Sequence, residues 1–378
     1  MAGGGGSLAP RAGADLTLRM NAIHQLVSGF VRGDAISNEA MALRAIFRGW
    51  GAASEIYCEH RRTFPEHRAD IRDLARAGTE IRPEDILILH LSVGSAANQR
   101  FADLRARRVL IYHNITPPHY FQGIREETAR ALALGREQMA RLSGSADLVL
   151  ADSAFNAGEL AELGYPNPQV FPLVFDYGTW GRPRRPHRGR RSGAESGAPL
   201  RVLFVGRGVP NKRIEDLLAT HYYLRRYHDP RAELKHVGSY NGLELYRGLL
   251  ETRLRQWELK GVEFTGPVTQ EALNQSYRDA DVFLCLSEHE GFCAPLLEAM
   301  HHEVPVIAYA AAAVPETLDG AGVLVREKRF DLLAALIARV GRDPDLRAGL
   351  LAAQQARMDR YRHRDPDSEL RALLQPLL

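Results

Sequence analysis

The feature that most limits the possible folds of this chain is a repeated alternation of short apolar runs with longer segments of helical periodicity. In the first half, runs such as SEIYCEH, DILILHLS, VLIYHN and DLVLADS alternate with helix-forming segments, one of them between SEIYCEH and DILILHLS and another over residues 121–142. The alternation begins again at RVLFVG and continues through AELKHVGS, VEFTG, DVFLCLS, PVIAYA and GVLV. This order is typical of parallel sheets covered by helices. The sequence therefore predicts an α/β protein with two Rossmann-like, doubly wound domains on either side of a central cleft.

Length and composition place the boundary between the two domains. At 378 residues the chain is too long for one ordinary hydrophobic core. Residues 181–199 are rich in Arg, Pro, Gly and Ser and have no apolar periodicity, which predicts a flexible linker. We expect a disordered N-terminus at 1–15, a first domain at 16–180 and a second at 200–360. A terminal helix is expected at 361–378, and its return to the first domain fits the pattern without being required by it.

Charge and cysteine content exclude several classes of protein. A formal net charge of +3 gives no reason to expect a nucleic-acid partner. Three cysteines without paired short spacing favour neither a disulfide framework nor a thiolate zinc site. The glycine-rich opening lacks the apolar block of a secretion signal, and no run approaches a membrane span of roughly 18 apolar residues. We expect a cytoplasmic protein, whose arginine-rich linker is either a solvated connector or a peripheral contact with an anionic membrane surface.

The segment RVLFVGRGVPNKRIEDLL predicts a strand, a glycine-bearing loop and a helix. Such a junction directs backbone N–H groups and the positive end of a helix at one place, which suits phosphate, and Arg207 and Lys212 add two charges. Asn211 stands where a dinucleotide fingerprint has its third glycine, and no GK[ST] follows, so nicotinamide enzymes and Walker-type ATPases are disfavoured. A diphosphate site remains. A surface turn with two solvated cations is the structural alternative.

The segment DVFLCLSEHEGFCAPLLEAM predicts a strand, a loop and a helix with Pro295 as its first residue. Glu290 then lies in the loop, and Glu298 lies about one turn into the helix after seven intervening residues. Both carboxylates can face a ligand across the helix start, one toward a sugar and one toward a ribose, because a carboxylate accepts hydrogen bonds from two vicinal hydroxyls. Two ordinary solvated carboxylates are the alternative interpretation.

The segments GRGVPNK and SEHEGFCAPLLEAM, with PVIAYAAAAVPETL after them, resemble the retaining family 4 glycosyltransferases (GT4), which have the GT-B fold. VLIYHN, ADSAFNAGEL and VFPLVFD resemble landmarks of the acceptor domain in that family. The resemblance implies transfer of a hexose from a nucleotide diphosphate sugar to a hydroxyl of a glycan or glycolipid acceptor, without metal or other cofactor. GDAISNEAMALR, HLSVGS and YHNITPPHYF resemble a subgroup of bacterial surface-polysaccharide mannosyltransferases. That favours GDP-mannose as donor and leaves UDP-sugars open.

The resemblance assigns roles residue by residue. Arg207 and Lys212 hold the diphosphate, Glu298 holds the ribose, Val268 seats the base, and Glu290 binds the transferred sugar. The implied donor-binding positions together are Gly33, Asp34, Arg207, Lys212, Val268, Glu290, Gly291, Phe292, Cys293, Ala294 and Glu298. The implied catalytic positions are His113, Glu290, Arg207 and Lys212. The weaker acceptor-binding positions are Asp34, Ser92, Asn114 and Thr116.

In the first domain, Gly33 allows the backbone to approach a ligand, and Asn38 is expected to cap the following helix. By resemblance this loop closes over the donor, and His113 lines the cleft and orients the substrate. Taken alone, a histidine at a strand end is more often structural.

Two positions depart from the family pattern, and two motifs suggest metal sites. Cys293 and Glu303 stand where relatives commonly have glycine; we expect the turn at Glu303 to tolerate the change and the Cys293 side chain to lie near the sugar. Asp279-Ala280-Asp281 spells the DxD triplet of metal-dependent glycosyltransferases, but its place between a helix and a strand predicts a structural role. His301 and His302, adjacent on a helix, point roughly 100° apart and do not easily share an ion. No metal site is expected.

Two other functions fit a two-domain α/β chain. One is a catalytically silent protein that binds nucleotide sugars or glycans on the same fold. The other is a solute-binding protein, which requires export. The combination of Arg207, Lys212, Glu290 and Glu298 favours the enzyme over the first, and the lack of an export signal disfavours the second.

Overall fold

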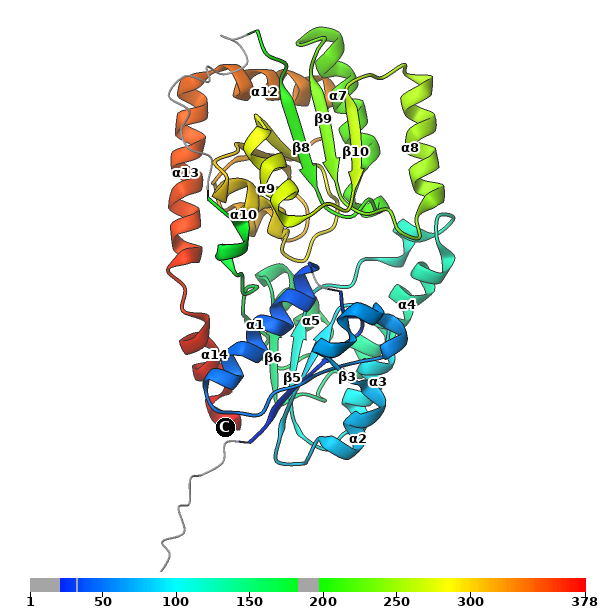
Figure 1. Ribbon diagram of the computed structural model, residues 1–378, viewed down its shortest axis with the longest axis vertical. Coiled ribbons are helices and arrows are strands. Elements are labelled where there is room, and N and C mark those ends of the chain that lie inside the picture. The colour runs from blue at the N-terminus through cyan, green and yellow to red at the C-terminus, as the bar shows by residue number, and fades with distance from the viewer. Residues whose placement is uncertain (1–20, 32, 183–196) are drawn as a thin grey trace, which may run out of the picture.

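The computed structural model of the chain describes residues 21–31, 33–182 and 197–378. The expected disordered N-terminus and most of the predicted linker lie outside these residues. Figure 1 shows two lobes, each with a sheet between layers of helices. All strand pairs within both sheets are parallel. This architecture is the predicted one.

The first domain is built on a seven-stranded sheet of order β3-β2-β1-β4-β5-β6-β7. Its strands are β1 Ile23–Val27, β2 Ile56–Cys58, β3 Arg72–Asp73, β4 Ile86–Leu91, β5 Arg107–Tyr112, β6 Leu148–Ala151 and β7 Gln169–Val170. Its helices include α1 Ala35–Gly49, α2 Ala77–Glu80, α3 Ala96–Asp103, α4 Glu126–Arg141 and α5 Ala154–Glu162. Every residue of β1 and β4 is buried, as expected of central parallel strands covered on both faces.

One predicted element of the first domain is wrong. The sequence suggested a helix between SEIYCEH and DILILHLS. The structure instead has short 3₁₀ turns at His60–Arg62, Pro65–Asp70 and Leu74–Arg76, the two-residue strand β3 and the four-residue helix α2. Pro65 lacks the N–H that a continuous helix needs, and Asp73 accepts a hydrogen bond from the Ala75 amide at 2.9 Å, which starts a new turn.

The second domain is built on a six-stranded sheet of order β10-β9-β8-β11-β12-β13. Its strands are β8 Arg201–Val205, β9 Glu233–Val237, β10 Val262–Gly266, β11 Val282–Cys285, β12 Val306–Tyr309 and β13 Val323–Val325. Its helices are α7 Ile214–Tyr227, α8 Glu244–Gln256, α9 Gln270–Asp279, α10 Ala294–His301, α11 Val314–Leu318 and α12 Phe330–Arg342. The strand order reverses between β8 and β11, and in the first domain between β1 and β4. Ligands of such sheets bind beyond the carboxyl ends of strands at this reversal.

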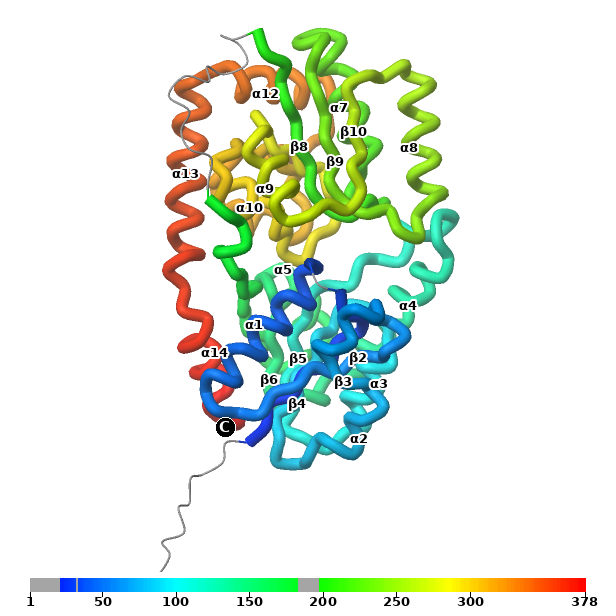
Figure 2. Tube along the Cα trace, in the orientation of Figure 1, coloured from blue at the N-terminus to red at the C-terminus, as the bar shows by residue number. Residues whose placement is uncertain are grey.

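The C-terminal helices join the two domains. Helix α13, Pro344–Arg362, runs along one side from the second lobe toward the first, where α14, Pro366–Leu374, ends the fold together with a 3₁₀ turn at Gln375–Leu377 (Figures 1 and 2). Leu370 and Leu374 are fully buried among residues of the first domain such as Ile23 and Leu43. The indole of Trp50 donates to Asp367 at 3.1 Å. The terminal helix is therefore part of the core of the first domain.

Cys293 and Glu303, the two positions noted above as departures from the family pattern, both have left-handed backbone conformations. The φ angle is 70° at Cys293, just before α10, and 58° at Glu303, just after it. Glycine adopts this region without steric cost, whereas a residue with a Cβ is strained there by about 1–2 kcal/mol. The turn accommodates Glu303, as expected, at that cost.

Replacing Glu303 by glycine is therefore expected to stabilise the protein. Relief of the left-handed strain outweighs the extra entropy of glycine in the unfolded chain, leaving a net gain of up to about 1 kcal/mol in the free energy of unfolding. Urea denaturation of wild type and Glu303→Gly measures the gain. Glu303→Ala is the control, because alanine loses the same carboxylate but keeps the strain. An equal gain in both variants would show that the side chain, not the backbone, is responsible.

Candidate functional site

Two loops of the second domain meet at the reversal of strand order, after β8 and after β11. They are joined by an ion pair in which Lys212 Nζ lies 2.5 Å from Glu290 Oε2, with both side chains largely buried. Burial by itself lowers the pKa of Lys212, but the carboxylate of Glu290, together with the nearby Cys293 sulfur, outweighs it and the pKa is raised. Lys212 is thus a buried cation at neutral pH. The structure brings these two predicted residues together.

Asn211 holds the same two loops together through its amide and its backbone. Its Nδ2 donates to the carbonyl of His289 at 3.0 Å, and the Glu288 amide donates to the carbonyl of Asn211 at 2.9 Å. Asn211 is only 3% exposed. Sequence reasoning noted this residue merely as a missing glycine. Its position beside Lys212 was the one available signal of this role.

The helix start beside the ion pair is that of α10. Cys293 precedes this helix without a capping side chain, and no acidic residue lies in the first turn. Helix α10 begins at Ala294, so Pro295 is its second residue rather than the predicted first. The N-terminus of an uncapped helix provides backbone N–H donors for an anion.

The start of α7, where the sequence predicts a phosphate site, carries acidic side chains. A 3₁₀ turn at Pro210–Lys212 separates β8 from this helix. The first turn of α7 carries Glu215 and Asp216, which pair with Arg213 at 2.9 and 3.2 Å. Negative side chains of the protein itself therefore compensate the positive end of α7. An anion next to Lys212 would instead meet the N-terminus of α10.

The other predicted donor residues lie around these loops. Glu298, in α10, accepts a hydrogen bond from the hydroxyl of Tyr277 at 2.7 Å, and burial raises its pKa. Tyr277, fully buried on α9, was missed by sequence reasoning. Arg207 lies two residues beyond the end of β8, Val268 lies in the turn before α9, and both are exposed. Phe292 and Cys293 are buried, and Ala294 is half-buried.

Two thiols lie beneath the ion pair. Cys285 Sγ and Cys293 Sγ are 3.9 Å apart, and ligand atoms of Cys285, Glu290 and Cys293 lie within 4.8 Å of one another. The Lys212 ammonium already neutralises the carboxylate of this group. A metal ion here would therefore be placed next to a buried positive charge.

The first domain contributes the loop after β1. Gly33 has φ 97°, and Asp34 caps α1, accepting from the Ser37 amide at 2.8 Å and from the Ser37 hydroxyl at 2.7 Å. The prediction that Asn38 is the cap is wrong. Asn38 lies inside α1, and its side chain accepts from the Gly33 amide at 3.1 Å. Asp34 precedes the helix directly, which is where a cap must lie.

His113 follows β5, and its side chain is only 1% exposed. Its Nδ1 lies 3.0 Å from Asp152 Oδ2, and its Nε2 lies 2.8 Å from His90 Nδ1. Both ring nitrogens are therefore engaged within the first domain. In this arrangement the ring of His113 offers no free nitrogen to a ligand, and its role of lining the cleft and orienting a substrate stays a prediction.

The three other predicted acceptor residues differ in how far their side chains are engaged. Asn114 has φ 77°, and its amide donates to Asn156 at 2.8 Å and to Glu159 at 3.0 Å. The hydroxyl of Ser92 is 3.1 Å from that of Ser28. Thr116 is half-buried two residues beyond Asn114. The structure places these residues at the carboxyl ends of β4 and β5, on the side that faces the second domain.

Gly291 is where the loops of the two domains touch. Ser153 Oγ donates to its carbonyl at 2.8 Å. A Cβ at this position would lie 2.6 Å from the Cβ of Asn114 and 2.8 Å from the carbonyl oxygen of His113. Only glycine fits this contact without displacing backbone.

A second contact between the domains lies at the start of α5. The carboxylate of Glu316, in α11, accepts from the amide of Ala154 at 2.8 Å and from that of Phe155 at 3.4 Å. A residue of the second domain thus satisfies free N–H groups of a helix of the first. Sequence reasoning missed Glu316, because nothing local shows which helix a carboxylate of another domain will meet.

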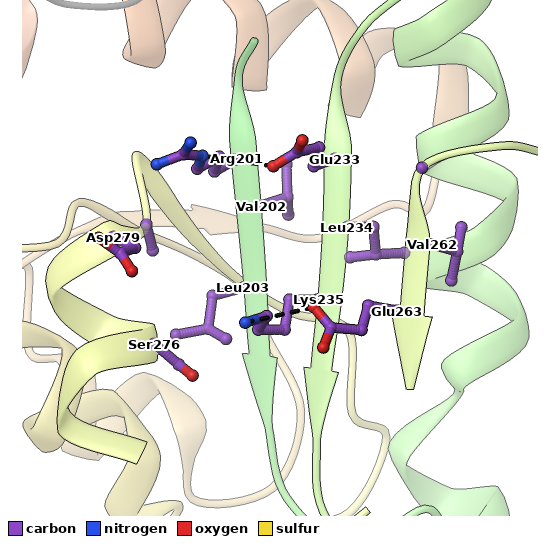
Figure 3. A pocket seen from close by; sticks show the side chains of 12 residues that line it. Arg201, Val202, Leu203, Glu233, Leu234, Lys235, Val262, Glu263, Ser276 and Asp279 are labelled. Carbon is purple, nitrogen blue, oxygen red and sulfur yellow. Dashed lines mark hydrogen bonds and ion pairs between the residues drawn. The ribbon is translucent and has the colours of Figure 1, made fainter. Parts of the chain in front are cut away.

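A hollow of ≈ 430 Å³ lies at the other end of the second sheet (Figure 3). It is lined by strand starts and by Asp279, and Lys235 pairs with Glu263 there at 3.2 Å. Asp281 accepts from the Arg201 amide at 3.0 Å, which joins β11 to β8. Asp279 and Asp281 therefore lie far from the carboxyl ends of the strands, and Asp281 has the structural role that the sequence predicted.

Residues 199–343 match the family model described as glycosyl transferases group 1. This match spans most of the second domain. Relatives include O-antigen chain mannosyltransferase B of Escherichia coli, 30% identical over 164 residues and 41% of each chain. A D-inositol 3-phosphate glycosyltransferase of Streptomyces scabiei is 31% identical over 61% of this chain and 53% of that protein. A GDP-mannose-dependent alpha-mannosyltransferase of Mycolicibacterium smegmatis is 32% identical over 44% and 40%. The matches span between 40% and 53% of the length of these relatives.

Solved structures of glycosyltransferases share the whole fold. Sucrose-phosphate synthase from Thermosynechococcus elongatus superposes with a TM-score of 0.72 at 18% identity, covering 94% of this chain and 99% of that one. WaaG, a glycosyltransferase involved in lipopolysaccharide biosynthesis, gives 0.65 at 13% identity, covering 93% and 99%. At these identities the likeness shows the fold, and the predicted GT-B architecture is confirmed.

The contact at Gly291 generates a prediction. Gly291→Ala is expected to separate the two domains, because the new methyl group would overlap Asn114 and the carbonyl of His113. Small-angle scattering of the variant should give a larger radius of gyration than wild type. Gly158→Ala is the matched control, since a Cβ at this position of α5 meets no atom within 4 Å. An unchanged radius in Gly291→Ala would mean that the contact does not hold the domains together.

Proposed function

We propose that this chain is a retaining glycosyltransferase that moves a hexose from a nucleotide diphosphate sugar to a hydroxyl of a glycan or glycolipid. The observation that carries the proposal is the buried pair of Lys212 and Glu290 beside the uncapped start of α10. This group lies where the strand order reverses and where the first domain meets the second. The match of residues 199–343 to the family model and the names of the relatives support the same class of reaction.

Breaking the bond between the anomeric carbon and phosphate places negative charge on the departing nucleoside diphosphate. Lys212, Arg207 and the N–H groups at the start of α10 are placed to receive that charge. Glu290 holds Lys212 in position and in its charged form before the substrate arrives. Preorganised charges of this kind stabilise a transition state without reorganising during the reaction. The proposal requires no metal ion.

The carboxylates of α10 and of its preceding loop suit the two sugar rings of the donor. One oxygen of Glu298 accepts from Tyr277, which fixes the carboxylate and leaves its other oxygen for the hydroxyls of a ribose. Glu290 is proposed to bind the transferred hexose together with Gly291, Phe292, Cys293 and Ala294. Val268 would then contact the base. Cys293 adds a thiol where glycine would leave space, which makes it a candidate determinant of the sugar accepted.

Retention requires the acceptor hydroxyl to attack from the face that the diphosphate leaves, and its proton passes to the leaving phosphate. His113 then orients rather than attacks, which agrees with the engagement of both its ring nitrogens. Asp34, Ser92, Asn114 and Thr116 lie at the loops from which an acceptor would approach.

The acceptor is proposed to be a growing glycan, free or lipid-linked. No helix in the described part of the chain combines the length and the apolar character needed to cross a membrane. If the acceptor is lipid-linked, the protein is proposed to meet it from the cytoplasm, at an anionic membrane surface.

GDP-mannose is the donor that we favour, because two of the relatives are named as mannosyltransferases and one of these as GDP-mannose-dependent. UDP-sugars are the alternative. At equal concentration, GDP should raise the melting temperature more than UDP or ADP, since a ligand at concentration c that binds only the folded state stabilises it by RT ln(1 + c/Kd), which is larger for the tighter ligand. A larger shift with UDP would overturn the choice of base without affecting the reaction class.

Lys212→Ala should lower kcat by roughly a hundredfold, or about 3 kcal/mol, as for the loss of one preorganised contact to a transition state. Sugar transfer from a radiolabelled donor measures the loss. Lys235→Ala removes a lysine at the distant hollow and should leave kcat unchanged. If wild type binds the nucleotide yet neither transfers nor hydrolyses any sugar of a donor panel, the chain is a silent binding protein and the proposal fails.

A further inference from the structure

Polar side chains form a buried chain across the carboxyl ends of the central strands of the first domain. Each belongs to a different element: β1, α1, β4, the residue after β5, and the residue after β6. They are Gln25, Glu39, His90, His113 and Asp152. None is more than 8% exposed, and Glu39 and His90 are fully buried. The donor site described above uses none of their side chains.

The hydrogen-bond partners of His90 show which of its two ring nitrogens carries a hydrogen. The Nε2 of Gln25 donates to the carbonyl of Ala40 at 2.9 Å, so its Oε1 is the atom that faces His90 Nε2, also at 2.9 Å. An amide oxygen only accepts, which places the hydrogen of His90 on Nε2. Burial and the adjacent His113 lower the pKa of His90 well below its usual value, so the ring is neutral. Its Nδ1 is then an acceptor.

The proton between the two histidines must therefore come from His113. The ring planes differ by 7°, and the centroids are 5.0 Å apart while the nitrogens are only 2.8 Å apart. Two parallel rings with so short a nitrogen contact lie edge to edge, not face to face. This is the geometry of an N–H···N hydrogen bond along one line, in which His113 Nε2 donates to His90 Nδ1.

His113 carries a second proton toward Asp152. Its Nδ1 is 3.0 Å from Oδ2 of this buried carboxylate. Burial lowers the pKa of His113, but Asp152 and, less strongly, Glu39 outweigh it and raise the pKa to about 9. With both nitrogens protonated, the ring is a cation balanced by Asp152.

Glu39 completes the group as a carboxyl without a hydrogen-bond partner on either oxygen. Its Oε2 lies 3.5 Å from His113 Nε2 and 3.9 Å from His90 Nδ1. Asp152, the amide of Val174 and, more weakly, Arg364 also act on it, and the Val174 amide approaches it without the geometry of a full hydrogen bond. Burial raises the pKa of Glu39 to about 8, against which the charge of His113 acts. Near neutral pH, Glu39 is therefore protonated and the whole group is electrically neutral.

We infer that Gln25, Glu39 and His90 are positioning residues that hold His113 as a doubly protonated cation and thereby fix the 113–114 turn that meets Gly291. This turn is one of the parts of the first domain that touch the loop after β11. Its carbonyl can keep that place only while the ring beneath it keeps its orientation. The inference deepens the proposed function, because it assigns the support of the closed site to residues outside it.

The protonation state is tested by ¹⁵N chemical shifts of the histidine rings at pH 7, assigned with His90→Gln and His113→Gln. We expect both nitrogens of His113 in the imidazolium range and His90 as a neutral ring protonated on Nε2. Asp152→Asn should make His113 neutral. A neutral His113 in wild type would overturn the inference. One equivalent of bound metal, measured by elemental analysis and lost in Glu39→Gln, would also overturn it, because Glu39, His90 and His113, whose ligand atoms lie within 4.8 Å of one another, would then hold an ion.

A thermal-unfolding series over pH tests Glu39 itself. The native pKa of Glu39 is raised from 4.5 to about 8, so the native state holds an extra proton across this range and stability falls as pH rises through it. His113, raised from 6.5 to about 9 by the charges of Asp152, Glu39 and Asp34, adds a stability that is full below pH 6.5 and lost through pH 9.

Glu39→Gln removes the fall in stability with rising pH that Glu39 causes. Its melting temperature relative to wild type should therefore rise between pH 5 and pH 8, and Glu66→Gln, on an exposed turn, should show no such trend. A constant difference between Glu39→Gln and wild type would overturn the inference.

The catalytic readout is the alkaline limb of the pH profile of kcat. Without the charge of Glu39, His113 should lose its proton at lower pH. In Glu39→Gln the alkaline limb should therefore lie at lower pH than in wild type, while KM for the donor stays the same. A purely structural role would reduce stability without moving the limb, and that result would overturn the positioning role. If the protein transfers no sugar at all, the proposed function fails, yet the ring shifts and the unfolding series still decide the state of His113.

Discussion

The ion pair of Lys212 and Glu290 is the interaction on which the site of the second domain depends. A buried charge is costly unless it is paired and hydrogen-bonded, so neither residue could occupy this place without the other. The pair forces the loops after β8 and β11 to approach, and Asn211 secures the approach through both its side chain and its backbone. The start of α10 and the buried thiols then have little freedom, because they share the same loop.

The contact between the domains follows from this arrangement. With the loop after β11 fixed, Gly291 projects toward the first domain, and Ser153, His113 and Asn114 form the surface that it meets. Glu316 satisfies the free amides at the start of α5 from the other side. The terminal helix α14, buried in the first domain, connects the lobes a second time. Closure at the site is therefore supported both by loop contacts and by the path of the chain.

The parts that the sequence could predict are those determined locally. Alternating apolar runs and helical periodicity indicate parallel sheets wherever they occur, and the spacing of Glu290 and Glu298 shows that both lie near one helix start. Tertiary pairing could not be predicted. Asp216 looks like any acidic residue in a first turn, and only the fold shows that it contacts Arg213 and Lys328 and so compensates the start of α7.

Glu39 is the clearest case of a residue whose role could not be predicted from the sequence around it. In the run SNEAMALR it resembles a solvated carboxylate, yet it is fully buried against two histidines that are 51 and 74 residues away. The strands that carry those histidines lie side by side in the sheet, and nothing near Glu39 in the sequence shows this. His113 was singled out from its strand-end position, but its partners were not, since each comes from a different element.

The two domains share one electrostatic feature, a buried cation that is paired with a carboxylate. Each keeps one cation buried near Gly291 by pairing it with a carboxylate: Lys212 with Glu290 in the second domain, and His113 with Asp152 in the first. Such charges are already desolvated and oriented before a ligand arrives, so a reaction that builds charge at this place does not have to rearrange them. The difference lies in what each cation can reach. The ammonium of Lys212 lies beside a helix start that can bind an anion, whereas both nitrogens of His113 are already engaged, so its effect on a ligand passes through the backbone that it holds in place.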